Sequence, residues 1–131
     1  MEQSIAEQKA RELGIDRTQV VREYWEIIVL RALYESPQGR YLIFKGGTAL
    51  RLAYDSPRFS EDLDFSLTKD VMKGKFFPLI KKIISPFPAM SLTDLEEKYY
   101  TYLAEIKVTQ AYLPFPFRIK IEISKREIKG Y

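Results

Sequence analysis

Two short stretches, FKGGTAL at residues 44–50 and EDLDFSL at residues 61–67, decide how this chain folds. In the first, an apolar segment runs directly into paired glycines and then into residues with helical character. The second alternates polar and apolar residues, as a half-buried strand does. A strand, a glycine turn, a helix and a second strand in this order predict a mixed sheet with helices packed against it, of the α/β or α+β class.

The remaining sequence adds helices and strands around these two stretches. Asp16 or Thr18 can cap a long helix, and Ser36-Pro37-Gln38-Gly39 is typical of a turn. The expected helices cover residues 2–13, 16–35, 49–54 and 70–84, and the expected strands cover residues 41–44, 62–67, 99–112 and 117–123. All of them fit one domain spanning residues 1–131.

Composition limits the class of protein. The chain has 131 residues, of which 46% are hydrophobic and 30% charged, so we expect a packed core rather than global disorder. The N-terminal segment carries charge throughout and has no signal-peptide core, and no apolar run approaches a membrane span. We therefore expect a soluble, cytoplasmic protein without membrane contact. The net charge of +3 permits a phosphate-bearing partner without demanding one.

The chain contains no cysteine and no histidine. This composition excludes disulfide scaffolds, thiol nucleophiles, Ser-His-Asp chemistry and the usual zinc sites. A bound metal ion would need oxygen ligands, which favours Mg²⁺, Mn²⁺ or Ca²⁺.

The paired glycines, Gly46 and Gly47, have two readings. Glycines let backbone N–H groups approach a ligand closely, and the start of a following helix favours an anion; Thr48 could add a hydroxyl contact or cap that helix. The same residues also suit a plain turn between a strand and a helix. The pattern lacks the spacing of a Walker A loop.

Asp62 and Asp64 form the second candidate group. Residues i and i+2 of a strand point to the same face, so the two carboxylates would lie side by side and repel each other. Divalent cations relieve such repulsion, and two of them could clamp the attacking and leaving oxygens of phosphoryl or nucleotidyl transfer. An ordinary solvated strand face is the alternative.

The strand at 117–123 carries the third candidate, Glu122. Its polar face consists of Arg118, Lys120 and Glu122. If this strand lies beside the strand at 62–67, Glu122 can complete a cluster of three carboxylates. An exposed edge strand with alternating charges would explain the pattern equally well.

The segments at 44–50 and 58–65, in this order, resemble the AbiEii family of nucleotidyltransferase toxins, which are related to the MenT toxins. That family belongs to the DNA polymerase β-like nucleotidyltransferase superfamily. The resemblance covers most of residues 11–68 and about 118–127. It implies a polymerase β-like fold, a mixed sheet flanked by helices.

The resemblance also implies roles for the acidic residues. Asp62 and Asp64 would bind two Mg²⁺ ions, or Mn²⁺ in their place. Glu122 would be the third carboxylate, which would ligate the second metal ion and help deprotonate an acceptor hydroxyl.

A second set of roles concerns phosphate. By the same resemblance, Gly46, Gly47 and Thr48 would hold the triphosphate of an NTP. Lys45 and Arg58 are candidate phosphate contacts, although Arg58 could instead brace the loop before the strand at 62–67.

The implied activity is transfer of a nucleotidyl group from an NTP to RNA, including tRNA, or to a protein, by a toxin that a cognate antitoxin counters. The chain would be the nucleotidyltransferase core without the family's C-terminal helical region. Two other classes stay open. One is a nucleotide-binding module without turnover, or dependent on a partner. The other is an interaction protein that uses the aromatic residues of 99–117, although aromatic residues there pack in cores more often than they stack on RNA.

Overall fold

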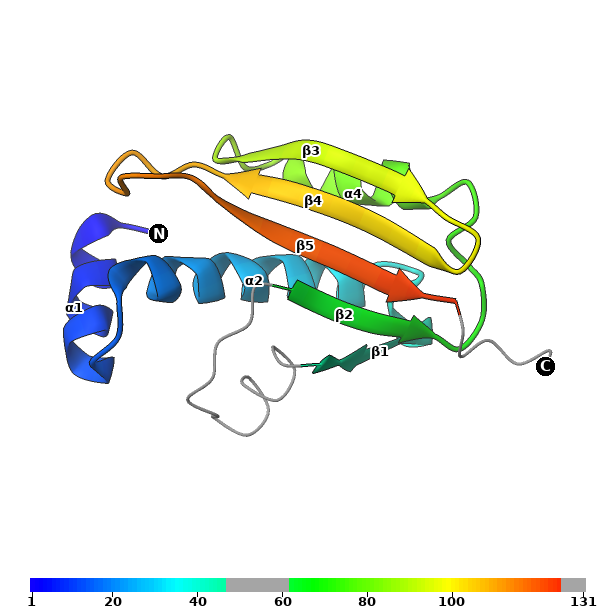
Figure 1. Ribbon diagram of the computed structural model, residues 1–131, viewed down its shortest axis with the longest axis horizontal. Helices are drawn as coiled ribbons and strands as arrows, with labels where there is room; N and C mark the ends of the chain where they lie inside the picture. The colour runs from blue at the N-terminus through cyan, green and yellow to red at the C-terminus, as the bar shows by residue number, and fades with distance from the viewer. Residues whose placement is uncertain (47–61, 126–131) are drawn as a thin grey trace.

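In the computed structural model, residues 1–46 and 62–125 are described, and they form a mixed five-stranded sheet with helices on one side (Figure 1). The helices are α1 (Gln3–Leu13), α2 (Arg17–Glu35) and α4 (Phe76–Ile84), with a 3₁₀ turn at Gly39–Tyr41. The strands are β1 (Leu42–Lys45), β2 (Asp62–Leu67), β3 (Met90–Glu97), β4 (Thr101–Val108) and β5 (Phe117–Ser124). The predicted α+β class is confirmed.

Strand β5 lies at the centre of the sheet, whose order is β1-β2-β5-β4-β3. It pairs in parallel with β2 and antiparallel with β4. The other two neighbouring pairs, β1–β2 and β3–β4, are antiparallel. The last described strand therefore joins two otherwise separate antiparallel pairs.

The core lies between the sheet and the helices α2 and α4, which pass behind the strands in Figure 1. Alternate residues of the central strands, such as Phe65, Ile121 and Tyr102, are fully buried on this side. Val29 and Leu33 of α2 are fully buried as well. Because side chains alternate along a strand, the polar residues between the buried ones face the opposite side of the sheet.

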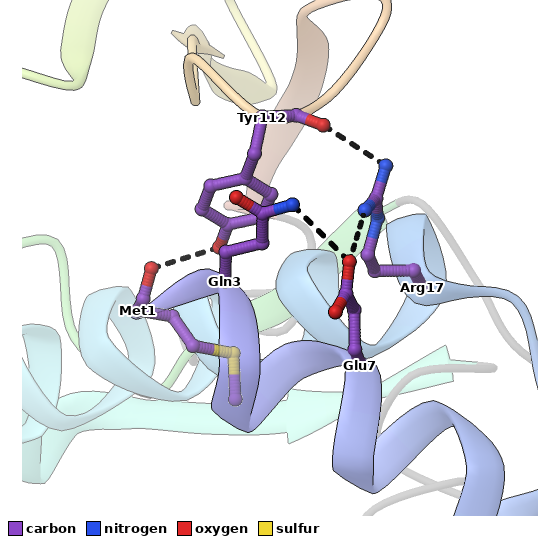
Figure 2. A network of polar contacts seen from close by, with 5 residues as sticks. All are labelled: Met1, Gln3, Glu7, Arg17 and Tyr112. Carbon is purple, nitrogen blue, oxygen red and sulfur yellow. Dashed lines mark hydrogen bonds and ion pairs between the residues drawn. The ribbon is translucent and has the colours of Figure 1, made fainter.

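Helix α1 is held against the loop between β4 and β5 by polar contacts (Figure 2). Arg17 donates hydrogen bonds to the Glu7 carboxylate, at 3.0 Å, and to the carbonyl oxygen of Tyr112, at 2.9 Å. The Tyr112 hydroxyl donates to the carbonyl oxygen of Met1 at 2.8 Å. These contacts join the first residues of the chain to a loop more than ninety residues away.

Several predicted elements are confirmed with small shifts in their bounds, and Asp16 caps α2 by accepting a hydrogen bond from the Thr18 amide at 3.1 Å. The helix expected from residue 70 begins only at Phe76, because the Asp70 side chain caps the Met72 amide and Gly74 adopts a positive φ of 71°. The strand expected over 99–112 is the shorter β4. The helix expected at 49–54 lies outside the described residues.

Strand β3 was not predicted. Its sequence, MSLTDLEE, is rich in residues that disfavour strands, and an irregularity between Leu92 and Asp94 interrupts the alternation on which a strand prediction depends. No helix in the described part of the chain is both long and apolar enough to cross a membrane.

Candidate active site

A row of three charged residues crosses the sheet on the side away from the helices. Lys45 of β1 is the register partner of Asp64 in β2, and Asp64 is the register partner of Glu122 in β5. Directly opposed residues on neighbouring strands point to the same face, with strands about 5 Å apart. Asp62 lies on the same face two residues before Asp64, opposite Lys120. The strand pairing on which a role for Glu122 depended is therefore present.

The row borders a cavity of about 220 Å³. Its lining residues come from β1, β2, β4 and β5: Lys45, Asp64, Phe65, Thr101, Glu122 and Ser124. Four strands thus contribute to one concave polar site, and both carboxylates of the central row face it.

Electrostatics single out Asp64. Burial raises the pKa of the Asp64 carboxyl above its ordinary value of 3.8, and the neighbouring charges of Asp62 and Glu122 raise it further. Lys45 and Lys120 act in the opposite direction on this pKa. A carboxylate that is desolvated and repelled by two others gains from a nearby cation, which makes Asp64 a candidate functional residue.

Gly46 is in close contact with this carboxylate. Its φ is +86°, and a Cβ atom built on it would lie 2.7 Å from Oδ2 of Asp64. A side chain here would meet both backbone strain and the Asp64 carboxylate. The glycine therefore lets the end of β1 pass beside Asp64, a steric role that differs from both predicted ones, close approach to a ligand and a plain turn.

The rest of the predicted phosphate-binding group lies outside the described residues. This applies to Gly47, Thr48 and Arg58, so their roles stay predictions. Of that group, the structure places Lys45 on the cavity wall and Gly46 beside Asp64.

The donor set suits a hard divalent cation. All the acidic candidates offer carboxylate oxygens, which Mg²⁺ and Mn²⁺ prefer. Within residues 1–46 and 62–125, however, no three side chains of the metal-binding types are arranged so that they could hold an ion together. The three-carboxylate metal site therefore stays a prediction, supported by the register of Asp64 with Glu122 and the raised pKa of Asp64.

Sequence reasoning missed two cavity residues, Thr101 and Ser124. They are register partners at the ends of β4 and β5 and place hydroxyl groups next to the carboxylate row. Thr101 lies in no charged or glycine-rich pattern, and Ser124, between Glu122 and Lys125, lacks the charge that marks its neighbours, so neither residue stood out in the sequence.

A larger cavity, of about 550 Å³, lies on the helical side of the molecule. It is mostly apolar and lies between the end of α2 and α4, with Ala32, Leu79 and Phe87 among its walls. Its single carboxylate, Glu35, has no second acid beside it in the lining, so the smaller polar cavity is the better candidate for chemistry.

Comparison with known proteins identifies the class first. The chain belongs to the AbiEii family, described as "Nucleotidyl transferase AbiEii toxin, Type IV TA system", whose family model matches residues 28–129. The predicted family is confirmed. No curated protein matches the sequence significantly.

Solved structures then give the particular relatives. A candidate nucleotidyltransferase from H. pylori has 24% identity and a TM-score of 0.65, and JHP933 from Helicobacter pylori has 25% identity and a TM-score of 0.64; each similarity covers 86% of this chain. MenT4, the nucleotidyltransferase toxin Rv2826c from Mycobacterium tuberculosis H37Rv, has 20% identity and a TM-score of 0.58 over 96% of this chain. The predicted nucleotidyltransferase fold is confirmed. The similarities cover only 48%, 46% and 44% of those three chains, so this chain spans about half their length.

Proposed function

We propose that this chain is a nucleotidyltransferase toxin that moves a nucleotidyl group from an NTP to an RNA or protein hydroxyl. The observation that carries the proposal is the register of Asp64 with Glu122, with Asp62 on the same face, beside a polar cavity. Membership of the AbiEii family supports the reaction class.

In this proposal the acidic residues hold divalent cations and manage the acceptor proton. Asp62, Asp64 and Glu122 bind Mg²⁺ or Mn²⁺, which supplies charge neutralisation to the phosphates and the attacking oxygen. The acceptor oxygen forms a bond to the α-phosphorus of the NTP, the bond from that phosphorus to the β-phosphate oxygen breaks, and pyrophosphate leaves. Glu122 receives the proton of the acceptor hydroxyl.

The basic and glycine residues hold the donor. Lys45, on the cavity wall, contacts the phosphates, and Gly46, Gly47 and Thr48 bind the triphosphate together with Arg58. Catalysis then consists mainly of positioning and charge neutralisation, as in phosphoryl transfer generally. The acceptor is an RNA, with tRNA among the candidates, or a protein, and the partner that counters the toxin is a cognate antitoxin in the cytoplasm.

The test is transfer of ³²P label from each of the four α-labelled NTPs to total RNA and to protein, in the presence of Mg²⁺. We expect label on one class of acceptor with wild-type chain, none with the double variant Asp62→Ala/Asp64→Ala, and normal labelling with Asp94→Asn. Asp94 is the matched control because it lies on β3 outside the cavity. Mg²⁺-dependent NTP binding without any labelling would replace the enzyme with a nucleotide-binding module. Labelling that survives in the double variant would refute the site.

A further inference from the structure

Two exposed tyrosines occupy the turn between β3 and β4, next to the candidate active site. Tyr99 is 82% exposed and Tyr100 is 55% exposed, whereas Tyr102, two residues further along, is fully buried in the core. Thr101, the residue after this tyrosine pair, lines the polar cavity. The aromatic residues of this segment thus divide into a packed core residue and an exposed pair at the site.

The turn is fixed on both sides. The Lys98 amide donates to the carbonyl oxygen of Thr101 at 2.7 Å, which closes the turn. The Lys125 amide, just past β5, donates to the carbonyl oxygen of Tyr100 at 2.7 Å, and Lys125 Nζ donates to the carbonyl oxygen of Lys98 at 3.1 Å. Figure 1 shows this turn beside the end of β5. The tyrosine backbone is therefore held in place relative to the strand that carries Glu122.

The rings of Tyr99 and Tyr100 also pack against each other. Their centroids are 4.5 Å apart with an interplanar angle of 86°, an edge-to-face arrangement. In such a pair the edge of one ring covers only one face of the other, so aromatic surface remains for a third flat group. With 82% of Tyr99 exposed, the available surface is mainly on that residue.

The charges around the turn balance. Lys98 pairs with Glu96 at 3.1 Å, and Lys125 lies 3.6 Å from Glu97. Among the described residues of the turn, two acids thus face two lysines, and these four charges balance. The chemistry of the turn favours an uncharged aromatic ligand.

The distance to the carboxylates suits a nucleotide. Thr101 is the register partner of Ser124, which lies two residues from Glu122 along β5. With a strand rise of about 3.3 Å and a strand spacing of about 4.8 Å, the tyrosine pair lies roughly 10–15 Å from the carboxylate row. Lys45 lies on β1, three strands from β4, so roughly 17–20 Å separates it from the tyrosine pair. A donor base reaches the pair only if its triphosphate lies extended from Lys45 across β2 and β5.

We infer that Tyr99 and Tyr100 form a stacking platform for a nucleobase, an inference that rests on the proposed function. The base belongs either to the NTP donor or to a nucleotide of an RNA acceptor, and both would use the same ring surface. Stacking on aromatic side chains tolerates different bases, because every base offers a π-face.

The test compares variants of the whole chain. Tyr99→Leu keeps an apolar side chain but removes the ring, and Tyr99→Phe restores it. Phe115→Leu is the matched control, because Phe115 is a 76% exposed aromatic residue in the loop between β4 and β5, at the other end of β4. The ligands are the four NTPs, tripolyphosphate and a single-stranded RNA oligonucleotide, each titrated calorimetrically with Mg²⁺.

For a donor base, we expect Tyr99→Leu to raise the Kd of at least one NTP about five- to a hundredfold, the range of stacking contributions, while tripolyphosphate binding stays unchanged. If the base belongs to the acceptor, Tyr99→Leu raises the Kd of the RNA oligonucleotide by the same factor and leaves the Kd of every NTP unchanged. In both cases Tyr99→Phe and Phe115→Leu bind as the wild type does.

Unchanged Kd values for all ligands with Tyr99→Leu would overturn the platform, and so would an equal loss with Phe115→Leu. Failure of the proposed function gives a different result. Wild-type chain that binds neither NTP nor RNA overturns both ideas. NTP binding that is lost in Asp64→Asn, together with NTP and RNA binding that are both kept in Tyr99→Leu, overturns only the platform.

Discussion

Replacing Asp64 by asparagine should stabilise the metal-free protein while it removes activity. Asp64 is partly buried and is repelled by Asp62 and Glu122, and both effects raise its pKa. At neutral pH the charged carboxylate therefore costs folding free energy, which a neutral amide of the same shape does not. A functional carboxylate kept at the expense of stability is the physical basis of this prediction.

The size of this stabilisation can be worked out from the register of β2 with β5. Asp64 and Glu122 are direct neighbours on adjacent strands, about 5 Å apart. Coulomb's law gives about 3 kcal/mol for two like charges at that distance with an effective dielectric constant near 20, and about 0.8 kcal/mol in water. Lys45 and Lys120 offset part of this repulsion, and solvent screens the rest. We expect Asp64→Asn to raise the free energy of unfolding by about 1 kcal/mol at pH 7, or the Tm by about 3 °C.

The stability that Asp64→Asn gains over the wild type should decrease as the pH falls. The folded pKa of Asp64 lies above its unfolded value of 3.8, so the folded wild type takes up the proton more readily. As pH falls from 7 through the folded pKa toward 3.8, the wild type gains stability relative to the variant. The difference between the two proteins should therefore shrink as the pH falls and disappear only below the unfolded pKa of 3.8.

Thermal unfolding with and without Mg²⁺ tests the reasoning. Mg²⁺ should stabilise the wild type and Asp94→Asn alike, because Asp94 lies outside the cavity, and should stabilise Asp64→Asn much less. The reasoning is refuted if Asp64→Asn is destabilised at pH 7 without metal, or if Mg²⁺ raises its Tm as much as that of the wild type.

Two further predictions concern the frame of the site. Gly46→Ala should lower the free energy of unfolding by about 1–3 kcal/mol, measured by urea unfolding, because φ is +86° and the new Cβ would meet the Asp64 carboxylate. It should also reduce nucleotidyl transfer more than the control Gly74→Ala does, since φ is +71° at Gly74 but the space around it is open. Equal losses of activity in the two variants would contradict this. Arg17→Met should lower stability by about 1 kcal/mol by removing the bonds to Glu7 and to the Tyr112 carbonyl, without changing the Kd for NTP; a changed Kd would show that α1 acts on the site.

Local sequence predicted the strands that carry the acids. In β2 and β5 the alternation is strict, since buried Leu63, Phe65, Ile121 and Ile123 alternate with polar residues on the other face. That period fixes which side chains share a face, so the carboxylates could be assigned to the side away from the core. The order of strands in the sheet is not encoded in any local period, so the pairing of Asp64 with Glu122 could be stated only as a condition.

Strand β3 was not predicted because its residues are those of an edge strand. Serine and three acidic residues weaken its strand propensity, and its irregular register breaks the alternation. Charged residues and bulges are common on edge strands, where they discourage pairing with other chains. Thr101 and Ser124 were missed for another reason: their position depends on the register of β4 with β5, which no single segment contains.

The central position of β5 has a consequence for the order of folding. All residues of the β1–β2 and β3–β4 pairs are synthesised before β5, but an isolated two-stranded pair is only marginally stable. Glu122 reaches Asp64 only when β5 closes the gap, which requires contact between residues 58 positions apart in the chain. Loop closure over such a distance is slow relative to local pairing. During synthesis, Asp62 and Asp64 are therefore present for some time before Glu122 can join them. The row of Lys45, Asp64 and Glu122 forms only when the sheet is completed.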